Sequence, residues 1–356
     1  MSAFMNHNPN NSFEVAQPPS DSVSSLSFSP KSNLLVSTSW DNQVRCWDIQ
    51  RIGTNIAAAP KSSFSHDHPV LCSTWKDDGM AVFSGGCDRQ VKMWSLMSGG
   101  HTSTVAMHDA PIKEIAWIPE MALLVTGSWD KTMKYWDLRQ PNPVHTQQLP
   151  ERCYALTVKH PLMVVGTADR NLIIFNLQSP QTEFKRIISP LKYQTRCVAA
   201  FPDKQGFLVG SIEGRVGVQH LDEGQDSKNF TFKCHRENNA LYSVNSINFH
   251  PVHHTFSTAG SDGSISFWDK DSKQRLKAMQ RFAMTGIREQ KIIILLLQRP
   301  PFSSTCHRTL MLKASQDLVE EGEAGFEQLG SGCNPMTSLY MHDILLVANT
   351  VIRDQG

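Results

Sequence analysis

A short phrase recurs along the first three quarters of the chain and constrains the fold more than any other feature. In each copy, an acidic residue in a turn precedes an aromatic residue, or its replacement, by six positions. Successive copies lie 39 to 49 residues apart, a period typical of repeat architectures. The six pairs are Asp41 and Trp47, Asp88 and Trp94, Asp130 and Trp136, Asp169 and Phe175, Glu213 and Gln219, and Asp262 and Trp268.

Each copy also alternates short apolar runs with turn residues. The units begin with runs such as SSLSFSP, LCSTWKDDG, KEIAWIPE and SINFHPVHH, and a second apolar run precedes the acidic turn. A third run ends at the aromatic position. Runs of this length, bounded by Gly, Asp, Asn or Pro, predict short antiparallel strands joined by tight turns. The chain is therefore predicted to be all-β.

Three copies carry the residues for a buried polar network. His66 and His108 stand 22 residues before the aspartate of their copy, and His235 stands 27 residues before Asp262. An imidazole and a hydroxyl can satisfy a buried carboxylate, so we interpret the repeated Asp and Trp as mainly structural. The predicted networks are His66, Ser84, Asp88 and Trp94; His108, Thr126, Asp130 and Trp136; and His235, Thr258, Asp262 and Trp268.

This pattern resembles the WD-repeat β-propeller family, whose repeats each form a four-stranded blade around a central channel. The resemblance covers residues 21–279, although copies four and five carry Phe175 and Gln219 in place of Trp. Residues 1–20 are expected to form an N-terminal arm, in which SFEVAQPP can supply the outermost strand of the last blade. The resemblance thus predicts a propeller with six readable repeats.

The repeat stops before residue 280. Residues 280–356 contain an aliphatic run, KIIILLLQ, a Pro-Pro break and an acidic Gly-rich stretch, but no phrase of the acid-turn-Trp kind. Two alternatives remain open for this tail. It is either a divergent element that forms an atypical last blade, or a disordered alternative C-terminus that leaves the ring open. An open ring exposes sheet edges, which reduces stability.

Composition and charge favour an ordinary globular protein. The chain has 34 basic and 33 acidic residues, so no global charge directs it to nucleic acid or membranes. Its longest aliphatic run, residues 292–297, is far shorter than the roughly 20 residues that span a bilayer. The N-terminus has no signal-peptide core. We expect a cytosolic or nuclear protein without membrane insertion, whose eight cysteines are reduced and mostly buried.

The sequence contains no motif of a known enzyme class. GxSxG, P-loop, GxGxxG and HExxH patterns are all missing, so neither catalysis nor a cofactor is expected. The nearest metal candidate is HPVHH, with His250, His253 and His254. We interpret it as a structural turn, because a zinc site needs further ligands. A propeller without catalytic residues is normally a docking surface, so function is expected in its loops.

Several stretches outside the repeat phrase resemble a narrower family, the WD-repeat mRNA export factors. Their sequence is most similar to that of plant members. They are residues 149–201, GSIEGRV, NFTFKCHR and residues 249–277. The resemblance implies a seven-bladed propeller that docks on a hairpin segment of a Phe-Gly-repeat nucleoporin. It also implies roles in mRNA export and mitotic spindle assembly, RNA or ribonucleoprotein as a partner, and shuttling between nuclear pore and cytoplasm. Residues 281–356 do not match the seventh blade.

Local charge supports RNA as a partner. Basic residues flank Phe230 and Phe232 in KNFTFKCHR, and single-stranded RNA requires counter-charge beside aromatic rings. By resemblance and local charge, the binding rim is predicted at Arg215, Phe232, Lys233, Arg236, Trp268, Lys270 and Lys273. The alternative is that Phe232 belongs to the core, that Trp268 is the blade tryptophan and that the lysines are merely solvated.

A second function is indicated by YWDLR. Trp136, Asp137 and Arg139 match the WDxR ending of propellers that serve as substrate receptors of cullin-type ubiquitin ligases. In that interpretation, Arg139 contacts an adaptor protein at the rim. An arginine after such a strand is more often a solvated loop residue. Salt sensitivity distinguishes the two functions, because phosphate contacts weaken steeply with salt, whereas adaptor docking depends more on buried contacts.

Overall fold

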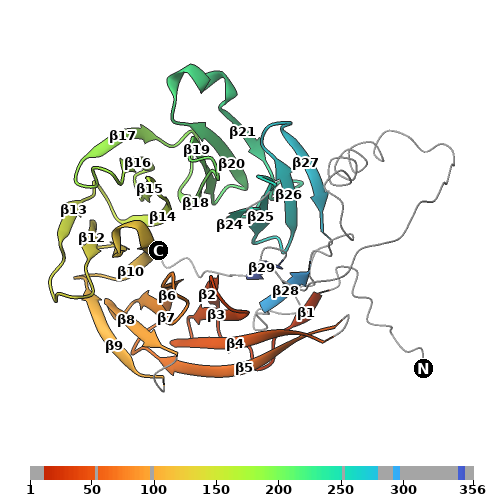
Figure 1. Cartoon of the computed structure of the whole chain (residues 1–356). Helices are drawn as coiled ribbons and strands as arrows, with labels where there is room; N and C mark the ends of the chain where they lie inside the picture. The colour runs from red at the N-terminus through yellow and green to blue at the C-terminus, as the bar shows by residue number, and fades with distance from the viewer. Residues whose placement is uncertain are drawn as a thin grey trace, which may run out of the picture.

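The computed structural model describes residues 12–52, 55–96, 100–250, 253–279, 292–296 and 344–348. Within these ranges, the helical elements are two 3-10 turns, η1 (Pro119–Met121) and η2 (Glu223–Lys228), and the regular structure is otherwise strand. The strands form a ring of antiparallel sheets (Figure 1). The predicted all-β propeller is confirmed.

Six four-stranded sheets form the blades, and each sheet follows the chain order of its strands. The strands are β2 (Val23–Phe28), β3 (Leu34–Ser39), β4 (Gln43–Ile52) and β5 (Asn55–Ser65) in blade one; β6 (Val70–Trp75), β7 (Ala81–Gly86), β8 (Gln90–Ser95) and β9 (Thr102–Met107) in blade two; β10 (Ile112–Ile118), β11 (Leu123–Ser128), β12 (Thr132–Trp136) and β13 (His145–Gln148) in blade three; β14 (Cys153–Lys159), β15 (Leu162–Thr167), β16 (Asn171–Asn176) and β17 (Glu183–Ile188) in blade four; β18 (Thr195–Ala200), β19 (Gly206–Ser211), β20 (Arg215–His220) and β21 (Phe230–Lys233) in blade five; and β24 (Val244–Phe249), β25 (Phe256–Gly260), β26 (Ile265–Asp269) and β27 (Gln274–Ala278) in blade six.

The first strand of each blade lies nearest the centre of the ring, and the fourth lies at its periphery (Figure 1). First strands of successive blades contact one another from β2 to β24. The second strands are buried along their whole length in most blades, because they have a neighbouring strand on each side and a neighbouring blade on each face.

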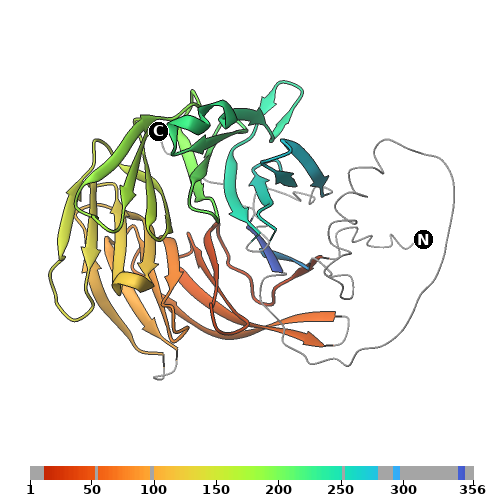
Figure 2. The ribbon, with the colours of Figure 1, turned by 45° about the horizontal axis from the view of Figure 1, so that its top comes forward.

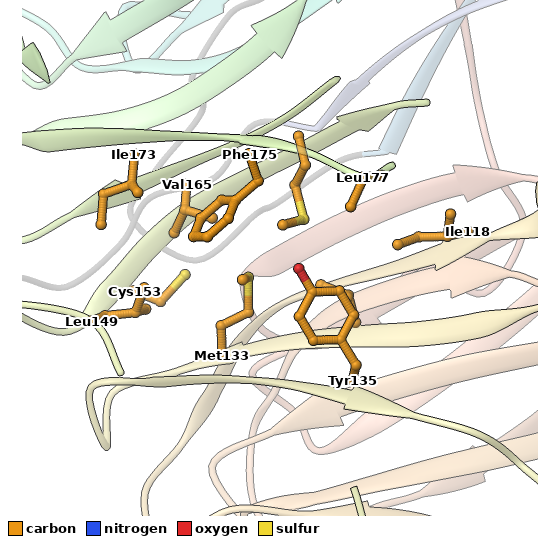
Figure 3. Packing of buried hydrophobic residues seen from close by; sticks show 11 residues of the cluster. Ile118, Met133, Tyr135, Leu149, Cys153, Val165, Ile173, Phe175 and Leu177 are labelled. Carbon is orange, nitrogen blue, oxygen red and sulfur yellow. The ribbon is translucent and has the colours of Figure 1, made fainter. Parts of the chain in front are cut away.

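The hydrophobic core is divided among the spaces between blades. Between blades three and four, Met133 and Tyr135 of β12 face Val165 of β15 and Phe175 of β16 (Figure 3). All four side chains are almost fully buried. Phe175 stands at the Trp position of copy four, so a smaller aromatic ring fills this interface. Each blade therefore buries its apolar side chains only against its neighbours, as expected for a repeat protein.

The acidic turn has the same backbone conformation in all six copies. The residue after the acid has a positive φ, between 64° and 72°, whether it is Asn42, Arg89, Lys131, Arg170, Gly214 or Gly263. In the five copies with aspartate, the carboxylate accepts the backbone N–H two residues further along. Short polar side chains stabilise such turns by this bond. It explains why the spacing from acid to aromatic residue never changes.

A three-stranded sheet lies between blade six and blade one (Figure 1, Figure 2). It pairs β1 (Ser12–Glu14) with β28 (Ile292–Leu296), and β28 with β29 (Ile344–Ala348). β29 contacts β2 of blade one. The sequence signals nothing at β29, and at β28 only an aliphatic run, because neither strand carries the repeat phrase. The remaining residues of the tail lie outside the described residues.

The segment after β1 is anchored on blade one. The indole N–H of Trp47 donates to the backbone oxygen of Ala16 (2.7 Å), and the backbone N–H of Ser20 donates to Asp41 (2.9 Å). Val15 is buried beside Trp47. A chain segment that precedes the first blade is thereby fixed to it.

The six described cysteines are free thiols: Cys46, Cys72 and Cys153 are buried, and Cys87, Cys197 and Cys234 are half-buried. Burial raises the pKa of Cys46 and of Cys234 to about 12. These thiols therefore behave as small apolar side chains. Cys306 and Cys333 lie outside the described residues. In the described part of the chain, no helix has the length and apolarity needed to cross a membrane.

Candidate functional site

The structure brings together the polar residues of the three predicted networks. His66 contacts Asp88 through Nδ1 (2.7 Å) and Ser84 through Nε2 (2.8 Å). The other two sets have the same geometry, with 2.7 Å for both His108 bonds and 2.9 Å for both His235 bonds. An imidazole with its proton on Nδ1 donates to the carboxylate and accepts from the hydroxyl, which satisfies both ends of the network.

The tryptophans join two of these networks. The indole N–H of Trp136 donates to Thr126 Oγ1 (2.9 Å), and that of Trp268 donates to Thr258 Oγ1 (3.0 Å). The expected equivalent in blade two does not form: Trp94 is not bonded to Ser84, and it packs instead against Phe64 at a centroid distance of 4.9 Å. Serine and threonine at this position therefore do not act identically.

Hydrogen bonding controls the charge of the network aspartates. Burial raises the pKa of each carboxyl, but the hydrogen bond from the imidazole and the other bonds that each carboxylate accepts outweigh this effect. The pKa of Asp88 and Asp130 consequently lies below its ordinary value, and that of Asp262 is lowered to about 2. A carboxylate held ionised by a fixed imidazole in every such blade stabilises the scaffold.

The two degenerate copies replace the imidazole in different ways. Asp169 accepts from Thr167 and from the side chain of Asn171 (2.6 Å). Glu213 has no histidine beside it, because buried Leu191 stands 22 residues upstream, where His66 and His108 stand in their copies. Its partners are arginines from the predicted rim.

The predicted rim lies between blades five and six, and its residues fall into two groups. Lys233 pairs with Arg215 at one end of β21, whereas Phe230 occupies the other end. The ammonium of Lys273 lies 4.9 Å from the centre of the Phe230 ring, so Lys273 belongs to that second end. A four-residue strand is about 10 Å long, so the two groups lie within reach of one short oligonucleotide.

The first group is arranged around Glu213. Arg236 donates from Nε to the backbone oxygen of Glu213 (2.9 Å), and its Nη2 lies 3.1 Å from Glu213 Oε2. Arg215 Nε lies 3.6 Å from the same Oε2. The carboxylate is only 8% exposed, while Lys233 beside it is exposed. Two guanidinium groups thus share one buried carboxylate.

The second group combines cations with aromatic rings. Lys270 lies 5.2 Å from the centre of the Phe201 ring, and Arg275 lies 6.0 Å from that of Trp268. The side chain of Lys270 is 10% exposed and pairs with Asp271 at 2.6 Å. Together with Lys273 over Phe230, three cations rest on three rings. Such contacts hold the positive charges in place.

Phe232 and Trp268 connect the two groups. Their ring centres lie 4.6 Å apart, and both side chains are half-buried. Trp268 is also the blade tryptophan bonded to Thr258. Both rings therefore pack in the space between the blades, and each also shows part of its surface.

Comparison with known proteins identifies the family of this chain. A family model described as WD domain, G-beta repeat matches residues 10–48, 59–95, 99–137 and 227–269, which hold copies one, two, three and six. Protein RAE1 from Arabidopsis thaliana is 78% identical over 279 residues, covering 78% of this chain and 80% of that protein. The chain belongs to the Rae1 family of WD-repeat proteins.

Rae1-family relatives from animals match over a similar extent. The mRNA export factor of Xenopus tropicalis is 50% identical over 293 residues, covering 78% of each chain. Protein Rae1 of Drosophila melanogaster is 50% identical over 292 residues, covering 78% of this chain and 83% of its own. The resemblance to WD-repeat mRNA export factors, inferred from the sequence, is confirmed.

The WDxR residues lie on blade three of the Rae1-family propeller. Trp136 is buried at the end of β12, whereas the side chain of Arg139 is 86% exposed in the following loop. The guanidinium of Arg139 makes a bidentate contact with Asp137, from Nε at 2.8 Å and Nη2 at 2.6 Å. Hydrogen bonds from Arg139 lower the pKa of Asp137 to about 2. Arg139 is therefore accessible, with two of its donors already engaged.

The histidines of HPVHH lie in the connection between β24 and β25. The backbone N–H of His253 donates to the ring nitrogen Nδ1 of His250 (3.1 Å), and the N–H of His254 donates to the backbone oxygen of His250 (3.2 Å). These bonds are those of a turn. Within the described ranges, no three His, Cys, Asp or Glu residues are placed to hold a metal ion.

Four residues of this site were not part of the predicted rim. Phe201, Phe230 and Arg275 complete the cation-aromatic contacts, and Glu213 pairs with the arginines. Arg275 was visible in the basic run KDSKQRLK, and Phe230 in KNFTFKCHR. Phe201 lies far along the chain from Lys270, and Glu213 stands 23 residues before Arg236, so these two contacts arise only in the folded propeller.

Proposed function

We propose that this Rae1-family propeller is a non-enzymatic scaffold for mRNA export. It binds RNA or ribonucleoprotein at the rim between blades five and six and docks on a hairpin segment of a Phe-Gly-repeat nucleoporin. Its place is the nucleus and the nuclear pore, with shuttling to the cytoplasm and a further role at the mitotic spindle. Relatives that are about half identical carry the name mRNA export factor.

The observation that carries the RNA proposal is the alignment of cations and rings along the rim. Lys270, Lys273 and Arg275 each lie within about 6 Å of the centre of an aromatic ring. Phosphates of a single strand need counter-charge, and its bases can stack on rings such as Phe232 and Trp268. Both requirements are met within the length of one short strand of the sheet.

The test is a charge reversal at both ends of the rim, Lys233→Glu with Lys270→Glu. We expect affinity for a fluorescein-labelled oligouridylate to fall at least about tenfold at low salt. The slope of log affinity against log salt should become shallower by about 1.4, since each phosphate contact to a single strand contributes about 0.7. Lys31→Glu with Lys159→Glu is the matched control, because it changes net charge equally on other blades.

The same variant tests competition between the two partners. Acidic segments of a nucleoporin and RNA are expected to use one basic rim, so affinity for a nucleoporin hairpin peptide, measured by calorimetry, should also fall. Unchanged affinity for both partners in the Lys233→Glu, Lys270→Glu variant would falsify the rim proposal. Equal losses in the Lys31→Glu, Lys159→Glu control would show a global charge effect instead.

The exposure of Arg139 supports one alternative, a substrate receptor of a cullin-type ubiquitin ligase. In that case Arg139→Ala should abolish capture of the adaptor protein in a pull-down and leave oligouridylate binding unchanged. Raising the salt concentration should weaken RNA binding far more than adaptor capture. Retention of the adaptor by Arg139→Ala would remove this alternative.

A further inference from the structure

Glu213 differs from the other five turn acids in what it binds. The five aspartates each accept the N–H of the residue two positions ahead and so close their own turn. Glu213 has one more methylene, and its Oε2 lies beside Arg236 and Arg215. The acid of copy five is thus directed away from the scaffold and toward the rim.

The backbone around Glu213 maintains this arrangement. A Cβ placed on Gly214 would lie 2.3 Å from the backbone oxygen of His235. The turn that carries Glu213 and Arg215 therefore packs directly on the segment that carries Arg236. Gly214 also has a φ of 65°, in the region that glycine adopts without strain. The packing of the backbone therefore brings Glu213, Arg215 and Arg236 together.

The two arginines are bound to Glu213 unequally. Arg236 has a hydrogen bond to the backbone oxygen of Glu213 in addition to its contact with Oε2. Among the residues that the structure describes, Arg215 has only the longer 3.6 Å ion pair to the carboxylate. Arg236 therefore stays bound to the backbone even when the carboxylate of Glu213 moves away. Arg215 can exchange that carboxylate for another anion.

We propose that Glu213 is a specificity-determining residue of the rim: its carboxylate occupies Arg215 in the free protein and must be displaced by a phosphate of the bound RNA. This inference rests on the proposed RNA function. A resident carboxylate lowers affinity for weak or isolated anions, while a strand that also engages Lys233 and the cation-aromatic contacts can displace it. Glu213 is 8% exposed, so solvent screens its charge less than that of an acid on the surface.

The direct test is Glu213→Gln, which removes the charge and keeps the size. We expect affinity for labelled oligouridylate to rise about fivefold at low salt, with the salt slope nearly unchanged, because a phosphate contacts Arg215 in both complexes. Asp271→Asn is the matched control. Asp271 pairs with Lys270, and its own side chain is 75% exposed. Removing its charge should therefore change affinity less than twofold.

A double-mutant cycle tests whether the effect passes through Arg215. In the Arg215→Gln background, Glu213→Gln should alter affinity less than twofold, because the displaced contact no longer exists. A weaker or unchanged affinity in the single Glu213→Gln variant, with thermal unfolding like that of the wild type, overturns the proposal. If even the wild-type chain and the Lys233→Glu, Lys270→Glu variant bind oligouridylate equally, the proposed RNA function itself fails.

A measurement on the unmodified protein covers the case in which Glu213→Gln does not fold. On titration with oligouridylate, the 15Nε resonance of Arg215 should shift, because its partner changes from carboxylate to phosphate. The 15Nε resonance of Arg236 should stay nearly constant, because its bond to the backbone oxygen persists. A shift of Arg236 alone would contradict the displacement of Glu213 from Arg215.

Discussion

At the residue scale, three blades depend on a buried carboxylate that is hydrogen-bonded to an imidazole. The exposed fraction of the side chain is 0% for His66 and 2% for Asp88. Removing one member of such a pair leaves the other without its hydrogen bonds in a place that water does not reach. The histidine of the network is therefore a structural residue of the blade.

The alanine substitution His66→Ala tests this role. We expect the free energy of unfolding to fall by about 3 kcal/mol, because Asp88 and Ser84 lose their partner in the core. His68→Ala, two residues away on the surface, is the matched control and should change it by less than about 0.5 kcal/mol. Urea denaturation followed by tryptophan fluorescence measures both. Similar small losses in the two variants would contradict the network.

Asp262 links stability to pH. Its pKa is lowered to about 2 in the folded chain, against an ordinary value near 4. A carboxyl with a depressed pKa contributes stability above its unfolded pKa and loses it as pH falls through the folded value. We expect the free energy of unfolding to decrease from about pH 4 to about pH 2. Asp262→Asn should be less stable at pH 7 and should show a shallower decrease over that range.

At the element scale, the six acidic turns share one backbone conformation but differ in the contacts that their side chains make. All six turns have a residue with positive φ, and in the first five blades the carbonyl of that residue accepts an N–H from the segment leading to the next blade. In blade five the residue is Gly214, and an added Cβ there would lie 2.3 Å from the backbone oxygen of His235. The short hairpin β22 (Arg236–Glu237) and β23 (Ala240–Leu241) begins there. Blade five thus uses a repeat turn to position Arg236.

Gly214→Ala is expected to destabilise the chain by at least about 2 kcal/mol, since it adds left-handed backbone strain to a clash with His235. Gly224→Ala is the control, because an added Cβ there meets ordinary contacts with Asp222. Thermal unfolding of both variants provides the comparison. If Gly214→Ala unfolded at the wild-type temperature, the close approach of the turn to His235 would be wrong.

At the scale of the whole molecule, the ring has to join its two ends. We propose that β1, β28 and β29 form its closing element, so that residues 1–20, 21–279 and 280–356 contribute to one propeller. The sheet joins the two ends of the chain, with Phe13 paired to Ile294, and β29 contacts β2 of blade one. An element in this position covers apolar faces of the first and last blades that an open ring would leave exposed.

Paired cysteines test the closing sheet. Phe13→Cys with Ile294→Cys should form a disulfide under mild oxidation, since directly opposed residues of antiparallel strands have Cβ atoms about 5 Å apart. Phe13→Cys with Leu296→Cys shifts the register by two residues and should cross-link poorly. Peptide mass spectrometry distinguishes the products. Equal yields from the two pairs, or tail residues lost at once in limited proteolysis, would refute closure by this sheet.

Most of the propeller could be predicted because its signals are local. The turn acid binds an N–H only two residues away, and the aromatic residue six positions on lies in the same hairpin. The spacing of the repeat therefore depends on contacts within one blade. Even the histidines 22 residues upstream belong to the adjoining turn. The strands β28 and β29 carry no such local signal, and their pairing joins residues from opposite ends of the chain.

The sequence by itself determined the all-β class, the six blades, the contacts of histidine, hydroxyl and aspartate in blades two, three and six, and the candidate cations of the rim. Only the tertiary structure decided which cations rest on rings, that Arg236 joins Arg215 at Glu213, and that Arg215 and Lys273 lie at opposite ends of β21. The physical reason is distance along the chain. Contacts within one hairpin follow from short-range stereochemistry, whereas contacts between blades exist only after the blades have packed together.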